Sequence, residues 1–309
     1  MFLALLFTLL KNIIYGTSVF FTGALSDSVD VLDILSLRFL MSFLVLYILK
    51  QIKILKIEVG IRDVFRATER QKYIKNLLLA AIFEPVLYML FETLGISMTT
   101  GITAGVILSI SPIASCICEE IVLKEKSTLL QKFFLALGIV GVMYIAVNTN
   151  TTDGKDTPVG ILFMFLAVVS GALFLVFSRK SSARFTAFEI TYFSSALGAV
   201  AFNIINIVRH LVQGNLLHYF DPYFDIQNMI GFVFLAIIST IVATSMNNYA
   251  ISKIQVSTSS AFGGVSTLVT IIIGVTLGGE TLYSYHIIGL VLIALRMIGV
   301  SYIAIKKNK

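Results

Sequence analysis

The chain has 309 residues, of which 57% are apolar and 13% charged, and its formal net charge is +6. Its mean hydropathy is +0.94, whereas a soluble domain has about 45–50% apolar and roughly 25% charged residues. Because even a large soluble domain leaves about a quarter of its chain surface exposed, this composition excludes a soluble enzyme, a disordered chain and a nucleic-acid-binding protein. We therefore expect a multi-pass protein of the cell membrane, plasma or inner, with the lipid bilayer as its surroundings.

Ten apolar runs are long enough to cross the hydrocarbon core as helices, which takes roughly 20 residues each. These runs are continuous, which argues against the alternating pattern of a transmembrane β-barrel. The first run has no basic start and no cleavage site, so we expect it to remain in the mature protein. The predicted fold is an all-α integral membrane protein of ten transmembrane helices. They cover residues 2–24, 31–49, 76–97, 101–123, 130–148, 158–178, 186–208, 228–250, 257–278 and 284–305.

The uneven distribution of lysine and arginine between the expected loops predicts the orientation. With a cytoplasmic N-terminus, eighteen of the 23 basic residues lie on the cytoplasmic side, and Lys155 and Arg209 lie outside. The other three, Lys11, Arg38 and Arg296, fall within spans. We therefore expect both termini to be cytoplasmic. The positive net charge is then a signal of orientation and not of a nucleic-acid partner.

The two halves of the chain resemble each other. Each half closes on a similar seven-residue stretch, 141–147 and 299–305, in which five positions are identical. Weaker matches recur at a spacing of 155 residues. A unit of five helices begins and ends on opposite faces of the membrane, so its second copy must be inverted. The predicted organisation is a first repeat, an extracytoplasmic linker, a second repeat and a basic cytoplasmic tail, at 1–148, 149–157, 158–305 and 306–309.

Five charged residues stand out within the expected spans. Lys11, Glu84 and Arg296 lie nine or ten residues from a cytoplasmic end, which places them roughly 13–15 Å deep, near the midplane. Arg38 and Glu92 lie nearer the outer face, where they could pair. A charge at a span centre costs about 2.5–3.5 kcal/mol on the insertion scale, so such a residue is a functional hypothesis by default.

Glu84 is the foremost candidate because Pro85 follows it. A proline leaves an upstream carbonyl unpaired and bends the helix, so the carboxylate and the break lie together. One hypothesis is that Glu84 binds the substrate or carries a coupling proton. The alternative is a static salt bridge to Lys11 or Arg296. The three midplane charges sum to +1, which favours an anionic or carboxylate-bearing ligand.

Uncharged polar residues complete the candidate set. Asn247 and Asn248 offer donors and acceptors that could orient a ligand, and Asn247 is the repeat counterpart of Glu92. Hydrogen bonding between helices is the alternative for both. The remaining candidates for lining a substrate site are Tyr15, Tyr88, Ser111 and Ser266.

Metal and cofactor chemistry has little support. The three histidines have no metal-ligand spacing, and we expect the two cysteines, Cys116 and Cys118, to be packing residues. No phosphate-binding Gly-x-x-x-x-Gly-Lys motif is present. We therefore expect no cofactor, no metal and no enzymatic activity. Glu119, Glu120 and Glu125 are expected to form a solvated helix terminus.

Several local motifs resemble the EamA type of the drug/metabolite transporter superfamily. They are Tyr15-Gly-Thr-Ser in the first span, Leu37-Arg-Phe-Leu in the second, Ser109-Ile-Ser-Pro112 before Leu123-Lys-Glu-Lys, and Leu277-Gly-Gly-Glu280. The resemblance covers the whole chain. The sequence departs from it at Thr267, where proline is common, and at Lys11 and Arg296, where charges replace apolar or small residues.

The resemblance implies a central cavity lined by spans 1–4 and 6–9 and alternating access without ATP. On that plan the helix of Arg296 is peripheral, so we expect an inter-helix contact or snorkelling there, with ligand contact as the alternative. The predicted function is secondary active transport, as an exporter, of small organic metabolites such as amino acids, with a proton as the candidate coupling ion. The alternatives are multidrug or organic-cation efflux and a non-transporting scaffold. The oligomeric state stays open.

Overall fold

The computed structural model describes residues 2–26, 28–58, 71–98, 107–108, 110–148, 157–276 and 284–307. Every regular element within these ranges is helical, which confirms the all-α class. Six stretches are long and apolar enough to cross a membrane: Phe2–Ser26, Val31–Gln51, Tyr73–Gly95, Pro158–Ser181, Ala187–Gln213 and Ile226–Lys253. Helices also run through the described parts of the other four expected spans. The count of ten spans and the orientation stay predictions.

Within the described residues, the first half contains six α-helices and two π-helical segments. Its elements are α1 (Phe2–Ser26), α2 (Val31–Gln51), α3 (Gln71–Ala81), the π-helix η2 (Ile82–Leu87), α4 (Tyr88–Ser97), α6 (Ser111–Cys118), the π-helix η3 (Glu119–Leu123) and α7 (Leu129–Asn148). Most of the basic segment between α2 and α3 lies outside the described residues.

The second half contains the longest helices and one further π-helical segment. Its elements are α8 (Pro158–Ser181), α9 (Ala187–Gln213), the 3₁₀ turns η4 (Leu216–His218) and η5 (Asp221–Tyr223), α10 (Ile226–Val233), the π-helix η6 (Phe234–Ala243), α11 (Thr244–Lys253), α12 (Val256–Ala261), α13 (Gly263–Thr276) and α14 (Ser284–Lys307).

Local sequence signals explain where several helices begin and end. Asp30 caps α2 by accepting a hydrogen bond from the Leu32 backbone N–H at 2.8 Å. Thr186 and Glu189 form a reciprocal capping box at the start of α9, and Gly214 ends that helix with φ +69°. A left-handed residue at this position favours glycine because no Cβ opposes it.

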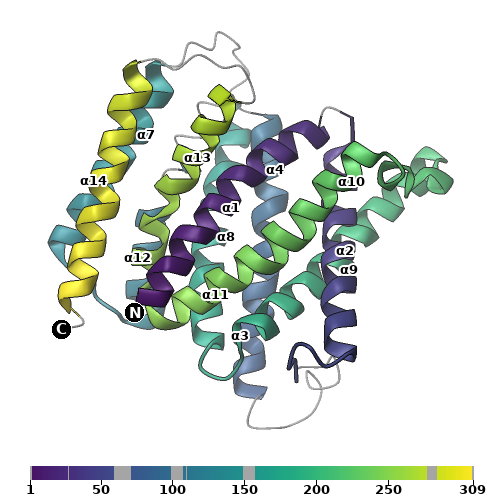
Figure 1. Ribbon diagram of the computed structural model, residues 1–309, viewed down its shortest axis with the longest axis horizontal. Coiled ribbons are helices and arrows are strands. Elements are labelled where there is room, and N and C mark those ends of the chain that lie inside the picture. The colour runs from purple at the N-terminus through teal and green to yellow at the C-terminus, as the bar shows by residue number, and fades with distance from the viewer. Residues whose placement is uncertain are drawn as a thin grey trace.

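The helices of each half pack mainly against helices of the other half. α1 contacts η6, α11 and α13, α2 contacts α9 and η6, and α8 contacts α3, α4 and α6. Exchanging the two halves reproduces these pairings, as expected for two equivalent units. α7 and α14 run side by side along one edge of the bundle (Figure 1). The central elements of the bundle are therefore α1–α4 with their counterparts α8–α11.

Glycines permit the closest of these approaches. A Cβ on Gly16 of α1 would lie 2.5 Å from the Ser266 carbonyl oxygen of α13, and one on Gly198 of α9 would lie 2.7 Å from Pro85. Small residues at helix interfaces drive association in lipid because they let backbones approach. The contact at Gly198 seats the proline break of η2 directly against α9.

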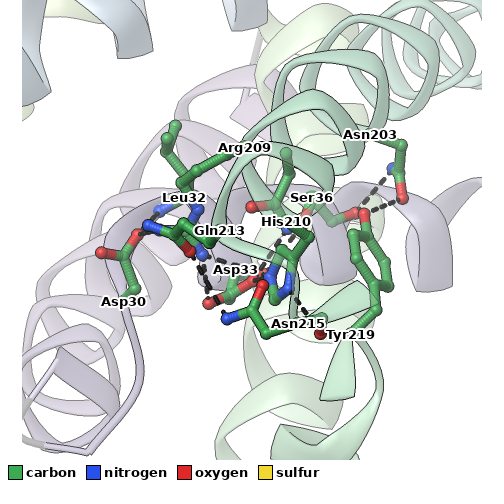
Figure 2. A network of polar contacts seen from close by, with 11 residues as sticks. Asp30, Leu32, Asp33, Ser36, Asn203, Arg209, His210, Gln213, Asn215 and Tyr219 are labelled. Carbon is green, nitrogen blue, oxygen red and sulfur yellow. Dashed lines mark hydrogen bonds and ion pairs between the residues drawn. The ribbon is translucent and has the colours of Figure 1, made fainter. Parts of the chain in front are cut away.

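A buried polar network joins the first turn of α2 to the last turns of α9 (Figure 2). The Asp33 carboxylate accepts a hydrogen bond from Asn206 Nδ2 at 2.8 Å and one from Arg209 Nη2 at 2.6 Å. His210 Nε2 lies 2.8 Å from the same carboxylate. Arg209 also pairs with the exposed Asp30. Both oxygens of the Asp33 carboxylate thus help to hold the two helices together.

Replacing Asp33 by alanine should lower the free energy of unfolding by about 3–5 kcal/mol, because it leaves the buried His210 and the partly buried Arg209 without their shared carboxylate. The Tm of the purified protein in detergent measures this loss. Asp30→Ser is the control, because serine keeps an N-cap side chain for α2 and only an ion pair of the 55% exposed Asp30 side chain is lost, which contributes at most about 1 kcal/mol. Equal shifts for the two variants would contradict the assignment.

Candidate functional site

The third expected span, which consists of α3, η2 and α4, breaks at Glu84, as the sequence predicts. Glu84 has φ −144° and ψ 125°, non-helical values within η2. A residue before proline is disfavoured in the α region by the clash with the proline ring. The break lies between α3 and α4, so the Glu84 carboxylate is presented at the interruption of the helix.

Four charged residues from four elements gather deep in the bundle. Glu84 lies within electrostatic range of Lys11 on α1, Arg38 on α2 and Glu92 on α4. The structure describes all four residues, and no nitrogen of one lies within 4.0 Å of a carboxylate oxygen of another. Arg38 and Glu92, which the sequence allows to pair, therefore form no ion pair with each other, and Glu84 forms none with Lys11.

Lys11 is held by an amide instead of an acid. Its Nζ donates to Asn247 Oδ1 of α11 at 2.7 Å, and it lies 5.7 Å from the centre of the Tyr15 ring. The Lys11 side chain is buried. A neutral acceptor satisfies one donor of the ammonium group while leaving its charge uncompensated.

Arg38 is held by hydroxyl groups of η6. Its Nε donates to Thr240 Oγ1 at 2.8 Å and its Nη2 to Ser239 Oγ at 3.3 Å. The Nη1 group makes no hydrogen bond to any residue that the structure describes. Arg38 is also partly exposed although it lies deep within the bundle. One edge of its guanidinium group thus has donors without a partner among the residues that the structure describes.

Both predicted tyrosines belong to this region. The Tyr15 hydroxyl lies 3.3 Å from Thr244 Oγ1, and the Tyr88 hydroxyl donates to Glu92 Oε1 at 2.7 Å. Tyr15, Tyr88, Glu84 and Glu92 are all partly exposed. The region therefore combines two acids, two bases and two aromatic rings, and we call it the central charged site.

Asn248 belongs to a different polar cluster. Its Oδ1 accepts from Ser178 Oγ of α8 at 2.8 Å and its Nδ2 donates to Thr191 Oγ1 of α9 at 3.1 Å. Asn248 is fully buried. Adjacent residues on a helix point about 100° apart, so Asn247 and Asn248 face different neighbours. The contacts of Asn248 are therefore hydrogen bonds between helices, which is the alternative to orienting a ligand.

The two candidate serines each bond to a backbone carbonyl three residues earlier in the chain. Ser111 Oγ donates to the Leu108 carbonyl at 2.6 Å and Ser266 Oγ to the Gly263 carbonyl at 2.7 Å. Their role in lining a substrate site stays a prediction. The buried side chain of Arg296, on α14, packs against Gly138 of α7 and Gly264 of α13. This is the inter-helix position expected for it.

The expectation of a solvated helix terminus at Glu119 is wrong. Glu119 is fully buried, and its carboxylate accepts hydrogen bonds from the backbone N–H groups of Val256 at 2.6 Å and Ser257 at 3.1 Å. A carboxylate at the start of a helix is stabilised by the helix dipole and the free N–H groups. Glu119 therefore ties the end of α6 to α12 in the other half of the chain.

Sequence reasoning missed the hydroxyl groups that hold the charged residues. Ser239, Thr240 and Thr244 carry no charge and lie in an apolar run, so neither hydropathy nor charge singles them out. The only signal was their density, three hydroxyl residues within six positions of one span. Among the described residues, no group of three histidine, cysteine or acidic side chains is arranged to hold a metal ion.

The Asn248 contacts can be tested by a double-mutant cycle with Ser178. We expect Asn248→Ala and Ser178→Ala each to lower the Tm in detergent and to show a coupling energy of about 0.6 kcal/mol, and at most ~1.7 kcal/mol, typical of hydrogen bonds between membrane helices. Lys11→Met combined with Asn248→Ala should be additive. A coupling to Lys11 as large as that to Ser178 would show that Asn248 belongs to the central charged site.

Comparisons with known proteins agree with this architecture. The model of the EamA-like transporter family matches residues 2–147 and again residues 158–302. The uncharacterized transporter YcxC of Bacillus subtilis (strain 168) is 31% identical over 97% of this chain and 93% of its own length. YetK of the same organism, also named an uncharacterized transporter, is 23% identical over 96% of this chain and 84% of its own.

A solved crystal structure of a protein 14% identical to this chain superposes with a TM-score of 0.73 and covers 99% of both chains. At that identity the likeness concerns the fold alone. The family match covers both halves of the chain and therefore most of the helices described above. The chain belongs to the EamA-like transporter family and is a multi-pass transporter of the cell membrane.

Proposed function

We propose that this protein is a secondary active exporter of small zwitterionic metabolites, such as amino acids, and that it works by alternating access. The observation that carries the proposal is the central charged site. There two acids and two bases lie within electrostatic range but form no ion pair with one another. A solute that bears both a carboxylate and an ammonium group would complement both kinds of charge.

The free energy of burying charge supports this proposal. Ionisable groups inside a membrane are costly and mark substrate or ion pathways. If Lys11, Arg38, Glu84 and Glu92 served only to stabilise the fold, direct pairs would satisfy them better, as they do for Asp33 and Arg209 at 2.6 Å. Holding Lys11 and Arg38 by neutral acceptors keeps them separate from the acids.

We further propose that Glu84 couples transport to protons. Its carboxylate makes no hydrogen bond to any residue in the described part of the chain, and it lies at the break in η2. A carboxylate at a helix break can exchange partners when the two helical pieces move. Binding a proton in one state and releasing it in the other would link the gradient to the substrate.

The alternative of organic-cation efflux draws on the same acids and on Tyr15 and Tyr88, since aromatic rings and carboxylates bind cations. Lys11 and Arg38 oppose it, because each places a positive charge beside those acids. The observed mixture of charges therefore favours a zwitterion over a simple cation.

Flux into proteoliposomes, with and without a pH gradient, tests these proposals. The probes are the twenty radiolabelled amino acids and the organic cation tetraphenylphosphonium. We expect amino-acid flux, accelerated by a proton gradient and fastest in the direction that corresponds to export. Flux of the cation alone would favour the efflux alternative, and no flux of any probe would favour a scaffold.

Glu84→Gln should reduce gradient-driven flux to the level of empty liposomes without lowering the Tm, because Glu84 makes no structural ion pair. Glu120→Gln is the matched control, since that carboxylate pairs with Lys132 at 2.9 Å beyond the end of the helix. Full gradient-driven flux in Glu84→Gln would remove Glu84 from the coupling mechanism.

We also propose ten spans with both termini in the cytoplasm, supported by the distribution of basic residues. Alkaline phosphatase, which is active only outside the cytoplasm, should be active when inserted within residues 149–157. It should be inactive when fused after residue 309. The opposite pattern would invert the topology.

A further inference from the structure

Two π-helical segments occupy equivalent positions in the two halves. η2 covers Ile82–Leu87 and η6 covers Phe234–Ala243. The 155-residue spacing of the repeats aligns Glu84 with Ser239 and Pro85 with Thr240. π-helical segments are rare and occur frequently at functional sites. The break that carries Glu84 therefore has a counterpart that carries hydroxyl groups.

The wide turn of η6 determines how Thr240 can bond. Its hydroxyl donates to the Leu235 carbonyl, five residues earlier, at 2.9 Å, whereas a threonine in an α-helix bonds three or four residues back. Because the hydroxyl hydrogen is used there, its lone pairs accept from Arg38 Nε at 2.8 Å. Ser239 Oγ accepts from Arg38 Nη2. Two adjacent hydroxyls thus hold one side of the guanidinium group.

The turn of α2 that follows Arg38 also contacts η6. Ser42 Oγ lies 2.8 Å from the Arg38 carbonyl oxygen and 2.9 Å from the Ala236 carbonyl oxygen. This contact joins α2 to η6 one turn beyond Arg38. The side chain of Arg38 and the Ser42 side chain one turn later are therefore both in contact with η6.

Neutral acceptors orient Arg38 without cancelling its charge. Glu84 and Glu92 lie within electrostatic range of the guanidinium group, yet neither carboxylate contacts it in the described structure. The Nη1 donors stay unused, and an arginine with a free edge is suited to bind a carboxylate through charge-assisted hydrogen bonds. A direct pair with either acid would occupy that edge.

We infer that η6 determines the specificity of the central charged site. Its residues Thr240 and Ser239 position Arg38 so that the Nη1 edge of the guanidinium group binds the carboxylate group of the substrate. Thr240 is a positioning residue, because it acts through Arg38. The inference rests on the proposed function. It adds that Arg38 recognises the carboxylate of the substrate and that Thr240 and Ser239 hold Arg38 in place. Glu84, at the equivalent break in η2, then supplies charge of the opposite sign.

The first test uses the amino acid that the wild-type protein moves fastest and the corresponding amide, which lacks the carboxylate. Thr240→Val should raise the KM for the amino acid by about tenfold or more, the effect of one lost hydrogen bond to a charged group. The kcat should change little, and the preference for the amino acid over the amide should fall. Thr240→Ser keeps the hydroxyl and should restore the wild-type KM.

Thr17→Val is the matched control, because the Thr17 hydroxyl bonds only the Ile13 carbonyl of its own helix, at 3.0 Å. It should leave both the KM and the preference unchanged. An unchanged KM in Thr240→Val, with wild-type transport intact, would overturn the inference while the proposed function stands.

The second test does not require transport. Phenylglyoxal modifies accessible guanidinium groups, and mass spectrometry reports the fraction of Arg38 modified in the full-length protein. We expect Arg38 to react in the wild type and in Thr240→Ser. It should react less in Thr240→Val, where the released guanidinium group pairs with Glu84 or Glu92. Modification of Arg38 that is independent of Thr240 would overturn the positioning role. Dependence on Thr240 without amino-acid flux would support the positioning role and overturn the proposed substrate.

Discussion

Hydrocarbon offers no hydrogen-bond partner, and this constraint governs how the protein treats each polar side chain in its spans. Several such groups are hydrogen-bonded by another helix. Asp33 holds Asn206, Arg209 and His210, and Asn248 holds Ser178 and Thr191. The central charged site is the exception, since its acids and bases stay apart. Within the described residues, some buried charges are thus paired with an opposite charge on another helix, as Asp33 is, and others are held by neutral acceptors, as Lys11 and Arg38 are.

Helix α2 connects these two kinds of polar group. Its first turn is attached to α9 through Asp33, and its middle is attached to η6 through Arg38 and Ser42. Interruptions of the helices occur where the charges lie: Glu84 is at the break in η2, and Ser239 and Thr240 are in η6. A continuous α-helix uses its backbone groups internally, whereas an interrupted one leaves room for side chains and ligands. The regular helices α1, α2 and α4 therefore carry Lys11, Arg38 and Glu92, and the interruptions contribute Glu84 and the hydroxyl groups that bond Arg38.

Much of this architecture could be predicted from the sequence. Apolar runs located the helices, and Pro85 located the break at Glu84, because both signals are local. The depth of Lys11 and Glu84 followed from counting residues along a helix of known rise. The partners could not be predicted in the same way. Arg38 bonds Thr240 rather than Glu92, and Glu119 binds the start of α12 rather than solvent. Each of these contacts joins residues more than a hundred positions apart.

By itself, the sequence determined that the protein is a helical membrane protein and which charges lie deep in its spans. It did so because hydropathy and helical rise depend only on neighbouring residues. The tertiary structure alone decided which of those charges are neutralised and which are held apart. That outcome depends on the packing of one half of the chain against the other, which brings η6 beside Arg38, α11 beside Lys11 and α9 beside Asp33. The side chain across a helix interface determines whether a buried charge is paired with an opposite charge or held by a neutral acceptor.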